Sequence, residues 1–251
     1  MARDPVVTAC VLIIGNEILS GRTQDANLAH IARELNEAGV QVRHARVIPD
    51  VEEIIIENLN ECRARYDYVF TTGGIGPTHD DITADCVAKA LGRELYLHPD
   101  IESIIRRREA PPEVMASRLR MARVPEGAAL LENPFGPHGF RIENVFVMAG
   151  IPRVMHAMLT SAIGRLEGGK PVRSRSITAF VTESQVASPL GQLQARYPDL
   201  DIGSYPFSRG DRFGTSLVAR GTDVAALEAL AAEIRALVEG VGGEIVEEGD
   251  G

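Results

Sequence analysis

Three glycines and two adjacent carboxylates occur together in the segment TTGGIGPTHDD, residues 71–81. A glycine-rich turn ahead of a helix can present backbone N–H groups to a phosphate, because no side chain keeps the ligand away. Carboxylates repel phosphate unless a cation lies between them, and Mg²⁺ or Mn²⁺ prefers such oxygen ligands. The segment therefore predicts a phosphate site with a divalent cation beside it, at Gly73, Gly74, Gly76, Asp80 and Asp81.

The same residues have a simpler interpretation. Many strand-to-helix turns use glycine only for its backbone freedom, and a single aspartate can cap the helix that follows. The segment matches neither the GxGxxG fingerprint nor the P-loop, since no GK[ST] follows the glycines. Two adjacent aspartates are more than a helix cap needs. We therefore favour a functional role for at least one of them, Asp81 more than Asp80.

Four other polar residues could take part in the same chemistry. Glu17 and Ser20 follow a buried apolar run, Asp50 follows another, and Asp85 lies one helical turn beyond Asp81. Each also has a local explanation. Glu17 could bond to the nearby backbone, Ser20 could cap a helix, Asp50 could begin the helix of "DVEE" as an N-cap, and Asp85 could be a solvated helix residue.

The elements that would position these residues alternate between strand and helix. Apolar runs predict strands, and helical periodicity with capping signals predicts helices between them. The predicted strands are 6–15, 40–48 and 66–74, and the predicted helices are 25–38, 50–63 and 82–91. This order indicates a doubly wound α/β domain with a parallel sheet. Because ligands bind at the carboxyl ends of such strands, "GNEILSGR", "IPD" and "TTGGIG" should line one edge.

The rest of the chain predicts more of this domain and then a second one. We expect two helices over 99–122 split at Pro111-Pro112, a loop at "ENPFGPHGF", a strand at "NVFVMAGIP" and a helix over 153–166. "LEGGKPV" is typical of a linker. The following β-α-β-β-α-β order is typical of a small split-βαβ domain. We therefore predict an α/β domain over 1–170 and a small KH-like α+β domain over 171–251.

Composition limits the classes of function. The net charge of -9 argues against general nucleic-acid binding, which requires a basic face. No apolar run is long enough to span a membrane, and we expect a cytoplasmic protein. Cysteine is present three times without paired metal-ligand spacing, so Cys10, Cys62 and Cys86 are predicted to be reduced, buried small residues.

Three segments together closely resemble a known family. "LIIGNEILSGRTQDAN", "VIPD" and "TTGGIGPTHDDITAD" are similar to the molybdopterin-binding (MoaB/Mog-type) fold, and within it to the CinA-like (competence/damage-inducible protein A) branch. The same module forms the first part of eukaryotic FAD synthases. The segment "FVMAGIP" of this chain resembles a strand end of that module. "IGSYP" is similar to the small C-terminal domain, so the resemblance extends over essentially the whole chain.

The resemblance also implies roles for single residues. It makes Thr72 and the glycines Gly73, Gly74 and Gly76 the phosphate-binding turn. It implies catalytic acids at Glu17, Asp50 and Asp81, metal ligands at Asp80, Asp81 and Asp85, and substrate contacts at Ser20, Asn133 and Gly139. The last two belong to "NPFGPHGF", a substrate-edge loop in which Phe135, Pro137 and His138 replace smaller residues.

Two activities follow from the resemblance. The CinA-like and FAD-synthase branch is associated with divalent-metal-dependent cleavage of ADP-ribose or FAD, and the molybdenum branch binds or adenylylates molybdopterin. We expect a nucleotide pyrophosphatase that uses Mg²⁺, Mn²⁺ or Co²⁺ and releases AMP. The alternatives are molybdopterin binding or adenylylation, and a non-catalytic nucleotide- or pterin-binding module. We expect neither deamidation nor FAD synthesis, since the domains for both are missing, and a homodimer or homotrimer.

Overall fold

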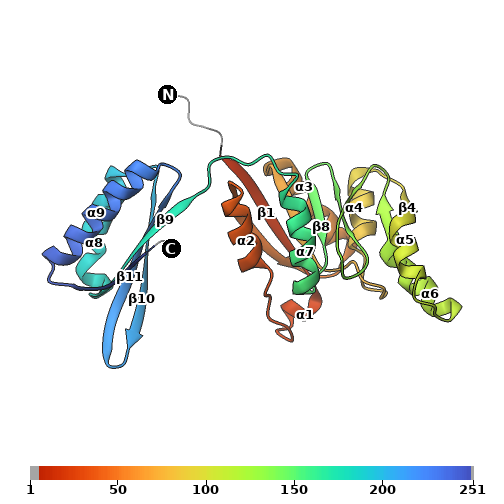
Figure 1. The fold of residues 1–251 in the computed structure, drawn as a ribbon, viewed down its shortest axis with the longest axis horizontal. Helices are drawn as coiled ribbons and strands as arrows, with labels where there is room; N and C mark the ends of the chain where they lie inside the picture. Colours follow the sequence, from red (N-terminus) through yellow and green to blue (C-terminus); the bar gives the residue numbers. More distant parts are fainter. Residues whose placement is uncertain (1–5, 250–251) are drawn as a thin grey trace. The chain divides into compact units, whose positions relative to one another are not determined.

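The chain folds into two compact units in a computed structural model that describes residues 6–249. The first unit ends at Gly169 and the second begins at Lys170, within the "LEGGKPV" segment. Figure 1 shows the first unit in red to green and the second in blue-green to blue. The first five and last two residues of the predicted domain ranges lie outside the described residues.

The first unit is built on a six-stranded sheet with the strand order β2-β1-β3-β8-β7-β6. Its strands are β1 (Val7–Ile14), β2 (Val40–Ile48), β3 (Tyr68–Thr72), β6 (Ala129–Leu131), β7 (Gly139–Ile142) and β8 (Val145–Met148). Strand β1 pairs in parallel with β2 and β3, and β3 pairs in parallel with β8. The carboxyl ends of these four strands therefore lie at one edge of the sheet.

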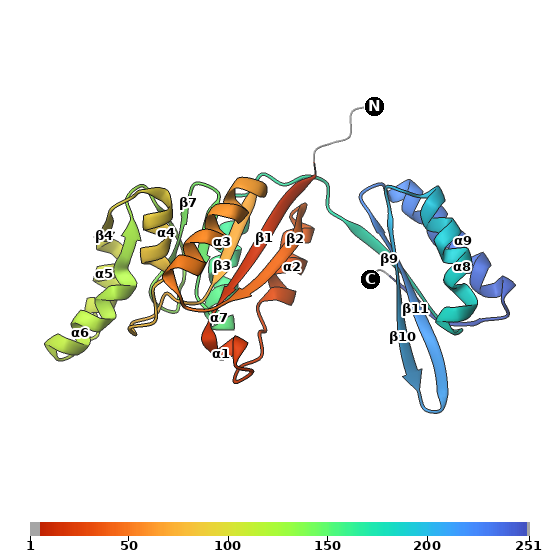
Figure 2. The same cartoon turned by 180° about the vertical axis from the view of Figure 1, so that it is seen from behind.

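Helices cover both faces of this sheet, which explains why β1 is apolar almost throughout. Ala9, Val11 and Ile13 pack towards α2 (Leu28–Glu37) and α7 (Pro152–Ile163). Cys10 and Leu12 point the other way, towards α3 (Glu52–Arg65) and α4 (Thr83–Leu91). The two helix layers are seen in opposite views, with α2 and α7 in front of the sheet in Figure 1 and α3 in front in Figure 2.

The expected parallel sheet is mixed, because β7 and β6 run antiparallel. Only Glu143 and Asn144 separate β7 from β8, and Glu143 has a positive φ of 51°. A two-residue connection can make only an antiparallel hairpin, since a parallel neighbour needs a crossover of about a dozen residues. The prediction of a loop through Phe140 was therefore wrong, because β7 begins at Gly139.

The segment between α4 and β6 forms a small subdomain of short elements. It contains β4 (Leu95–Leu97), α5 (Pro99–Arg106), α6 (Pro112–Leu119), the 3₁₀-helix η1 (Arg120–Ala122) and β5 (Arg123–Pro125). Strands β4 and β5 form their own antiparallel pair, which the sequence did not indicate. The predicted helix break at Pro111-Pro112 is confirmed, and Pro112 occupies the first turn of α6, where proline loses no hydrogen bond.

The second unit confirms the predicted β-α-β-β-α-β order. Its elements are β9 (Arg173–Phe180), α8 (Glu183–Arg196), β10 (Asp201–Arg209), β11 (Arg212–Gly221), α9 (Val224–Gly240) and β12 (Glu244–Gly249). The strands form a separate antiparallel sheet in the order β10-β11-β9-β12, and none of the described strands joins the two sheets. Ile177 and Leu217 pack with Leu190 of α8 and Leu230 of α9 to form its core.

All three cysteines are free and buried, as predicted. The Sγ atoms of Cys10 and Cys62 lie 3.1 Å apart between β1 and α3, and both residues belong to the core between the sheet and α3. Across the residues that the structure describes, no helix combines the length and apolarity needed to cross a membrane.

Candidate functional site

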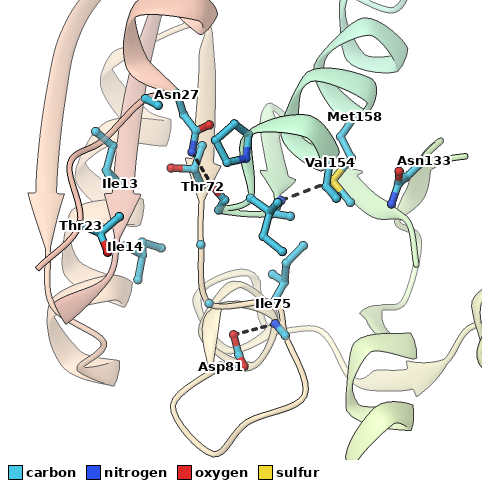
Figure 3. Close-up of a pocket in the computed structure, with 18 of the residues that line it drawn as sticks. Ile13, Ile14, Thr23, Asn27, Thr72, Ile75, Asp81, Asn133, Val154 and Met158 are labelled. Carbon is cyan, nitrogen blue, oxygen red and sulfur yellow. Dashed lines mark hydrogen bonds between the residues drawn. The ribbon is translucent and has the colours of Figure 1, made fainter. Parts of the chain in front are cut away.

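A cavity of about 570 Å³ opens at the carboxyl ends of the parallel strands. Its wall includes Ile13 from β1, Thr72 from β3 and the glycine turn that follows β3. The opposite wall comes from the loop before β7 and the start of α7, with Val154 and Met158 (Figure 3). The predicted meeting of "GNEILSGR" and "TTGGIG" at one edge therefore takes place, and it encloses a space that suits a small ligand.

The turn after β3 requires glycine because of its backbone angles, and it leaves two backbone N–H groups without a hydrogen-bond acceptor. Gly73 and Gly74 have φ angles of 97° and 67°, which side-chain-bearing residues rarely adopt. Thr83 fixes the turn, because its hydroxyl donates to the Gly73 carbonyl and its N–H to the Gly74 carbonyl, each at 3.0 Å. Among the described residues no acceptor is bonded to the N–H groups of Gly74 and Ile75, so these two amides can bind an anion.

Asp81 does not cap α4, contrary to the simpler interpretation of "DD". The residue at the N-cap position is Ile82, without a side-chain cap bond. The Asp81 carboxylate instead accepts from Gly76 N–H at 2.6 Å, from Thr78 N–H at 2.8 Å and from the Thr78 hydroxyl. Figure 3 shows the bond to Gly76 beside the cavity. Asp81 therefore closes the loop that follows the glycine turn.

Asp81→Asn is expected to reduce the free energy of unfolding by about 1–3 kcal/mol, because an amide N–H₂ would face a backbone donor. The Gly76 and Thr78 N–H groups need two acceptor oxygens, and asparagine offers only one. Urea unfolding measures the effect. Asp80→Asn is the control, since that side chain is 57% exposed and should change stability by less than about 0.5 kcal/mol. Equal stability of the two variants would contradict this role of Asp81.

Asp50 is a second residue whose predicted capping role was wrong. Val51 occupies the N-cap position of α3, and the Asp50 carboxylate accepts from Asn16 N–H at 2.8 Å. Asn16 begins the short helix α1 (Asn16–Leu19), which also carries Glu17. Burial raises the pKa of Asp50, and the negative charges of Glu17 and Asp80 raise it further. Three of the predicted acids therefore lie near one another at the ends of β1, β2 and β3.

The predicted metal ligands Asp80, Asp81 and Asp85 do not converge. Asp81 and Asp85 both line the small cavity that adjoins the main one, but Asp85 forms an ion pair with Arg123 and the Asp81 carboxylate bonds its own loop. Over residues 6–249, no three His, Cys, Asp or Glu side chains are close enough to hold a metal ion by themselves.

A divalent cation nevertheless fits the chemistry of the acids at the ends of β1 and β2. Mg²⁺ commonly uses only one or two protein carboxylates and takes its other ligands from substrate phosphates and water. Glu17 lines the cavity, and its charge disfavours the ionised form of Asp50 in the absence of a cation. A cation between the two carboxylates would remove that repulsion.

The predicted substrate contacts are only partly at the cavity. Ser20 is exposed, and its hydroxyl donates to the Glu17 carbonyl at 3.2 Å. Gly139 begins β7, where a Cβ would clash with the Val147 carbonyl, so its role is close strand packing. Asn133 does line the cavity, but its amide holds the loop by donating to Pro137 O and accepting from Phe135 N–H. Thr72 also lines the cavity.

The sequence prediction missed several residues of the cavity wall. Asn27 is only 4% exposed, and its amide donates to Gly150 O at 2.8 Å, which links the start of α2 to the segment after β8. In the sequence Asn27 lies inside the helix predicted over 25–38, where nothing distinguishes it from an ordinary helix residue. Ile13, Ile75 and Met158 make much of the remaining wall apolar, as is usual for small-molecule sites. In the sequence they cannot be distinguished from core residues.

The parallel-strand edge, the free amides and the apolar cavity are the features of an α/β fold that binds small-molecule ligands. Comparison with known proteins identifies the family within this class. Residues 10–168 match the family described as probable molybdopterin binding domain, and residues 171–242 match the middle domain of FAD synthase. Since the first match spans more than half of the chain, this protein belongs to the molybdopterin-binding domain family.

Individual relatives extend over different parts of the chain. A protein of Aeropyrum pernix is 34% identical over 261 aligned positions, which cover 96% of this chain and 97% of that protein. A CinA-like protein of Desulfosudis oleivorans is 36% identical over 77% of this chain, which is 50% of its own length. The crystal structure of CinA from Thermoplasma acidophilum, of unknown function, is 33% identical. It covers 63% of this chain and 96% of that one, with a TM-score of 0.57.

The resemblance to the MoaB/Mog-type fold and its CinA-like branch is thereby confirmed, as is the α/β fold with an additional small domain. The fold is one that binds small-molecule ligands. The cytoplasmic location, the homo-oligomer and the absence of nucleic-acid binding stay predictions.

Proposed function

We propose that this protein is a divalent-metal-dependent pyrophosphatase that cleaves the P–O–P link of an ADP-ribose-like or FAD-like dinucleotide and releases AMP. One observation carries the proposal. The free amides of Gly74 and Ile75 and the carboxylates of Glu17 and Asp50 lie at the same edge of the sheet, beside an apolar cavity. A pyrophosphate group is bound by hydrogen-bond donors on one side and by a cation that carboxylates hold on the other. The nucleoside attached to it needs an apolar pocket.

Each group of the chain has a distinct task in this proposal. The Gly74 and Ile75 amides bind a non-bridging phosphate oxygen, and Asp81 holds the turn that presents them. Glu17 and Asp50 would hold the cation. A bound divalent cation supplies charge neutralisation and makes a coordinated water more acidic. The apolar wall excludes bulk water from the nucleoside and positions it relative to the phosphates.

The second candidate is molybdopterin binding. It is favoured by the match of residues 10–168 to a family described as molybdopterin binding, and a pterin phosphate would use the same anion-binding turn. The match of residues 171–242 to the middle domain of FAD synthase favours the dinucleotide instead. In both cases the ligand combines a planar heterocycle with phosphate, so the two candidates share a cavity and differ in reaction.

A nucleotide panel separates these functions. ADP-ribose and FAD are each incubated with Mg²⁺, Mn²⁺ or Co²⁺, and AMP is measured by chromatography, with EDTA as the blank. The proposal expects AMP from at least one substrate and none in EDTA. If no AMP forms but molybdopterin binds stoichiometrically, the second candidate replaces the first. If neither occurs, both functions are wrong.

Phe135→Ala is expected to raise KM for the dinucleotide about five- to tenfold and to leave kcat nearly unchanged, because an aromatic contact is worth about 1 kcal/mol in ground state and transition state alike. Phe135 lines the cavity, is 47% exposed and stacks against the Arg153 guanidinium, 4.0 Å from its ring centroid. Steady-state kinetics measure the effect. Phe213→Ala in the second unit, where the ring is 75% exposed, is the control. An unchanged KM in Phe135→Ala would place the nucleoside elsewhere.

A further inference from the structure

His138 has one ring nitrogen committed to the protein and one that is free. Its Nδ1 is 2.9 Å from the backbone N–H of Asn133. Since a backbone N–H can only donate, Nδ1 must be the acceptor and carries no proton. The ring is therefore the neutral tautomer with its proton on Nε2. In the described part of the chain, no group is hydrogen-bonded to this Nε2–H.

The ring also lines the same cavities as the glycine turn. His138 lines the main cavity and the adjoining small cavity, which has room for about one water molecule at about 20 Å³. Both cavities are also lined by Gly74, Gly76 and Asp81. The Nδ1 edge of the ring faces its own loop, so the Nε2 edge is the one that can meet a ligand. Burial lowers the pKa of His138, which agrees with a neutral ring.

We infer that His138 is a substrate-binding residue whose neutral Nε2–H donates a hydrogen bond to a phosphate oxygen of the bound nucleotide. The inference rests on the proposed function for the identity of the ligand. It adds a side-chain donor to the two backbone amides of the glycine turn, which border the same cavity. A neutral donor forms a hydrogen bond with the anion but does not cancel its charge, which the cation does. The contributions of the hydrogen bond and of the cation to ligand affinity can therefore be measured separately.

The tautomer is tested on the parent protein without any substitution. Long-range ¹H–¹⁵N NMR of the histidine rings is expected to show His138 with an unprotonated Nδ1 and a protonated Nε2 at neutral pH. An Nδ1–H tautomer or an imidazolium would overturn the inference, whatever ligand the protein binds.

The contact is tested by AMP binding, measured by calorimetry in Mg²⁺. His138→Leu should weaken AMP binding about ten- to a hundredfold, the usual effect of losing a hydrogen bond to a charged oxygen. His138→Gln retains a side-chain N–H and should stay within about threefold of the parent. His44→Ala is the matched control, since His44 is also bonded through Nδ1, to the Tyr66 hydroxyl on a different part of the fold. It should bind AMP as the parent does.

The outcomes distinguish this inference from the proposed function. If Leu and Gln weaken AMP binding equally, or neither does, His138 only shapes its loop and the inference fails. If AMP binding follows the prediction but no dinucleotide is cleaved, the inference stands and the proposed reaction fails. If the parent binds no AMP, the inference fails, and AMP release in the nucleotide panel alone decides the proposed reaction. Circular dichroism of each variant checks the fold. If His138→Leu does not fold, the NMR measurement of the His138 tautomer in the parent protein decides whether the inference stands.

Discussion

Asp50→Asn is expected to lower metal-dependent turnover on the order of 10²- to 10³-fold, the size of effect seen when one preorganised charged or polar group is removed from a reaction centre. The asparagine oxygen can still accept from Asn16 N–H, so the backbone around α1 should keep its position. What is lost is the negative charge, and a hard cation binds a charged oxygen more strongly than a neutral one.

The same substitution should not destabilise the protein. Burial raises the pKa of Asp50 in the folded state, with further contributions from Glu17 and Asp80. A raised pKa means that the ionised carboxylate opposes folding at neutral pH, and that this opposition disappears as the pH falls through the folded-state pKa. Neutral asparagine removes the opposition at every pH. The urea midpoint of Asp50→Asn should therefore equal or exceed that of the parent at neutral pH.

Turnover and urea unfolding of the same sample measure both effects. Asp100→Asn, whose side chain is 77% exposed, is the control and should leave turnover and midpoint unchanged. A structural role for Asp50 would give the reverse result, with stability lost and turnover kept. The parent should also lose metal affinity as the pH falls towards the raised pKa of Asp50, since protonation removes the ligand charge.

Gly73→Ala is expected to reduce the free energy of unfolding by about 3 kcal/mol. A side chain at the φ of 97° costs about 1–2 kcal/mol, and overpacking adds about 1–3 kcal/mol. The new Cβ would clash with the carbonyl oxygen of Ile14, at the end of β1. That backbone is held on both sides by its neighbouring strands, so it cannot move away without breaking the sheet.

Gly136 provides the matched control, because it lines the same cavity. It is not among the glycines with positive φ, and an added Cβ would meet no atom within 4 Å. Gly136→Ala should therefore change the free energy of unfolding by less than about 1 kcal/mol, and can stabilise by restricting the unfolded chain. Chemical denaturation of both variants gives the comparison. Similar stabilities would show that the turn after β3 tolerates a side chain.

Local sequence patterns were sufficient to determine much of the fold. The apolar run of β1 and the alternation of strands with amphipathic helices determined a sheet covered on both faces. The element order after "LEGGKPV" determined the second unit. These features are encoded in short windows, where periodicity and turn residues act locally. The resemblance carried by the segments around Glu17, Asp50 and Asp81 then indicated the family, which the comparisons confirm.

The tertiary structure decided what each polar side chain does. "DVEE" and "HDD" both have the pattern of helix caps. Asp50, which follows β2, instead accepts from the backbone of Asn16, which follows the neighbouring strand β1, and Asp81 accepts from the turn that precedes it. Asp85 has the spacing of a metal ligand but pairs with Arg123, which lies 38 residues further along the chain. Several acceptors could satisfy each local pattern, and only the folded chain brings the actual partner near.

The tautomer of His138 and the antiparallel strands β7 and β6 were also decided by three-dimensional contacts. A glycine-rich segment such as "NPFGPHGF" has no periodicity from which a strand or a ring orientation can be predicted. The sequence by itself therefore determined the fold class and the edge of the sheet at which a ligand is expected. The folded chain alone decided which groups remain free to meet that ligand, because a hydrogen-bonding group is available only when no neighbour in space has already bound it.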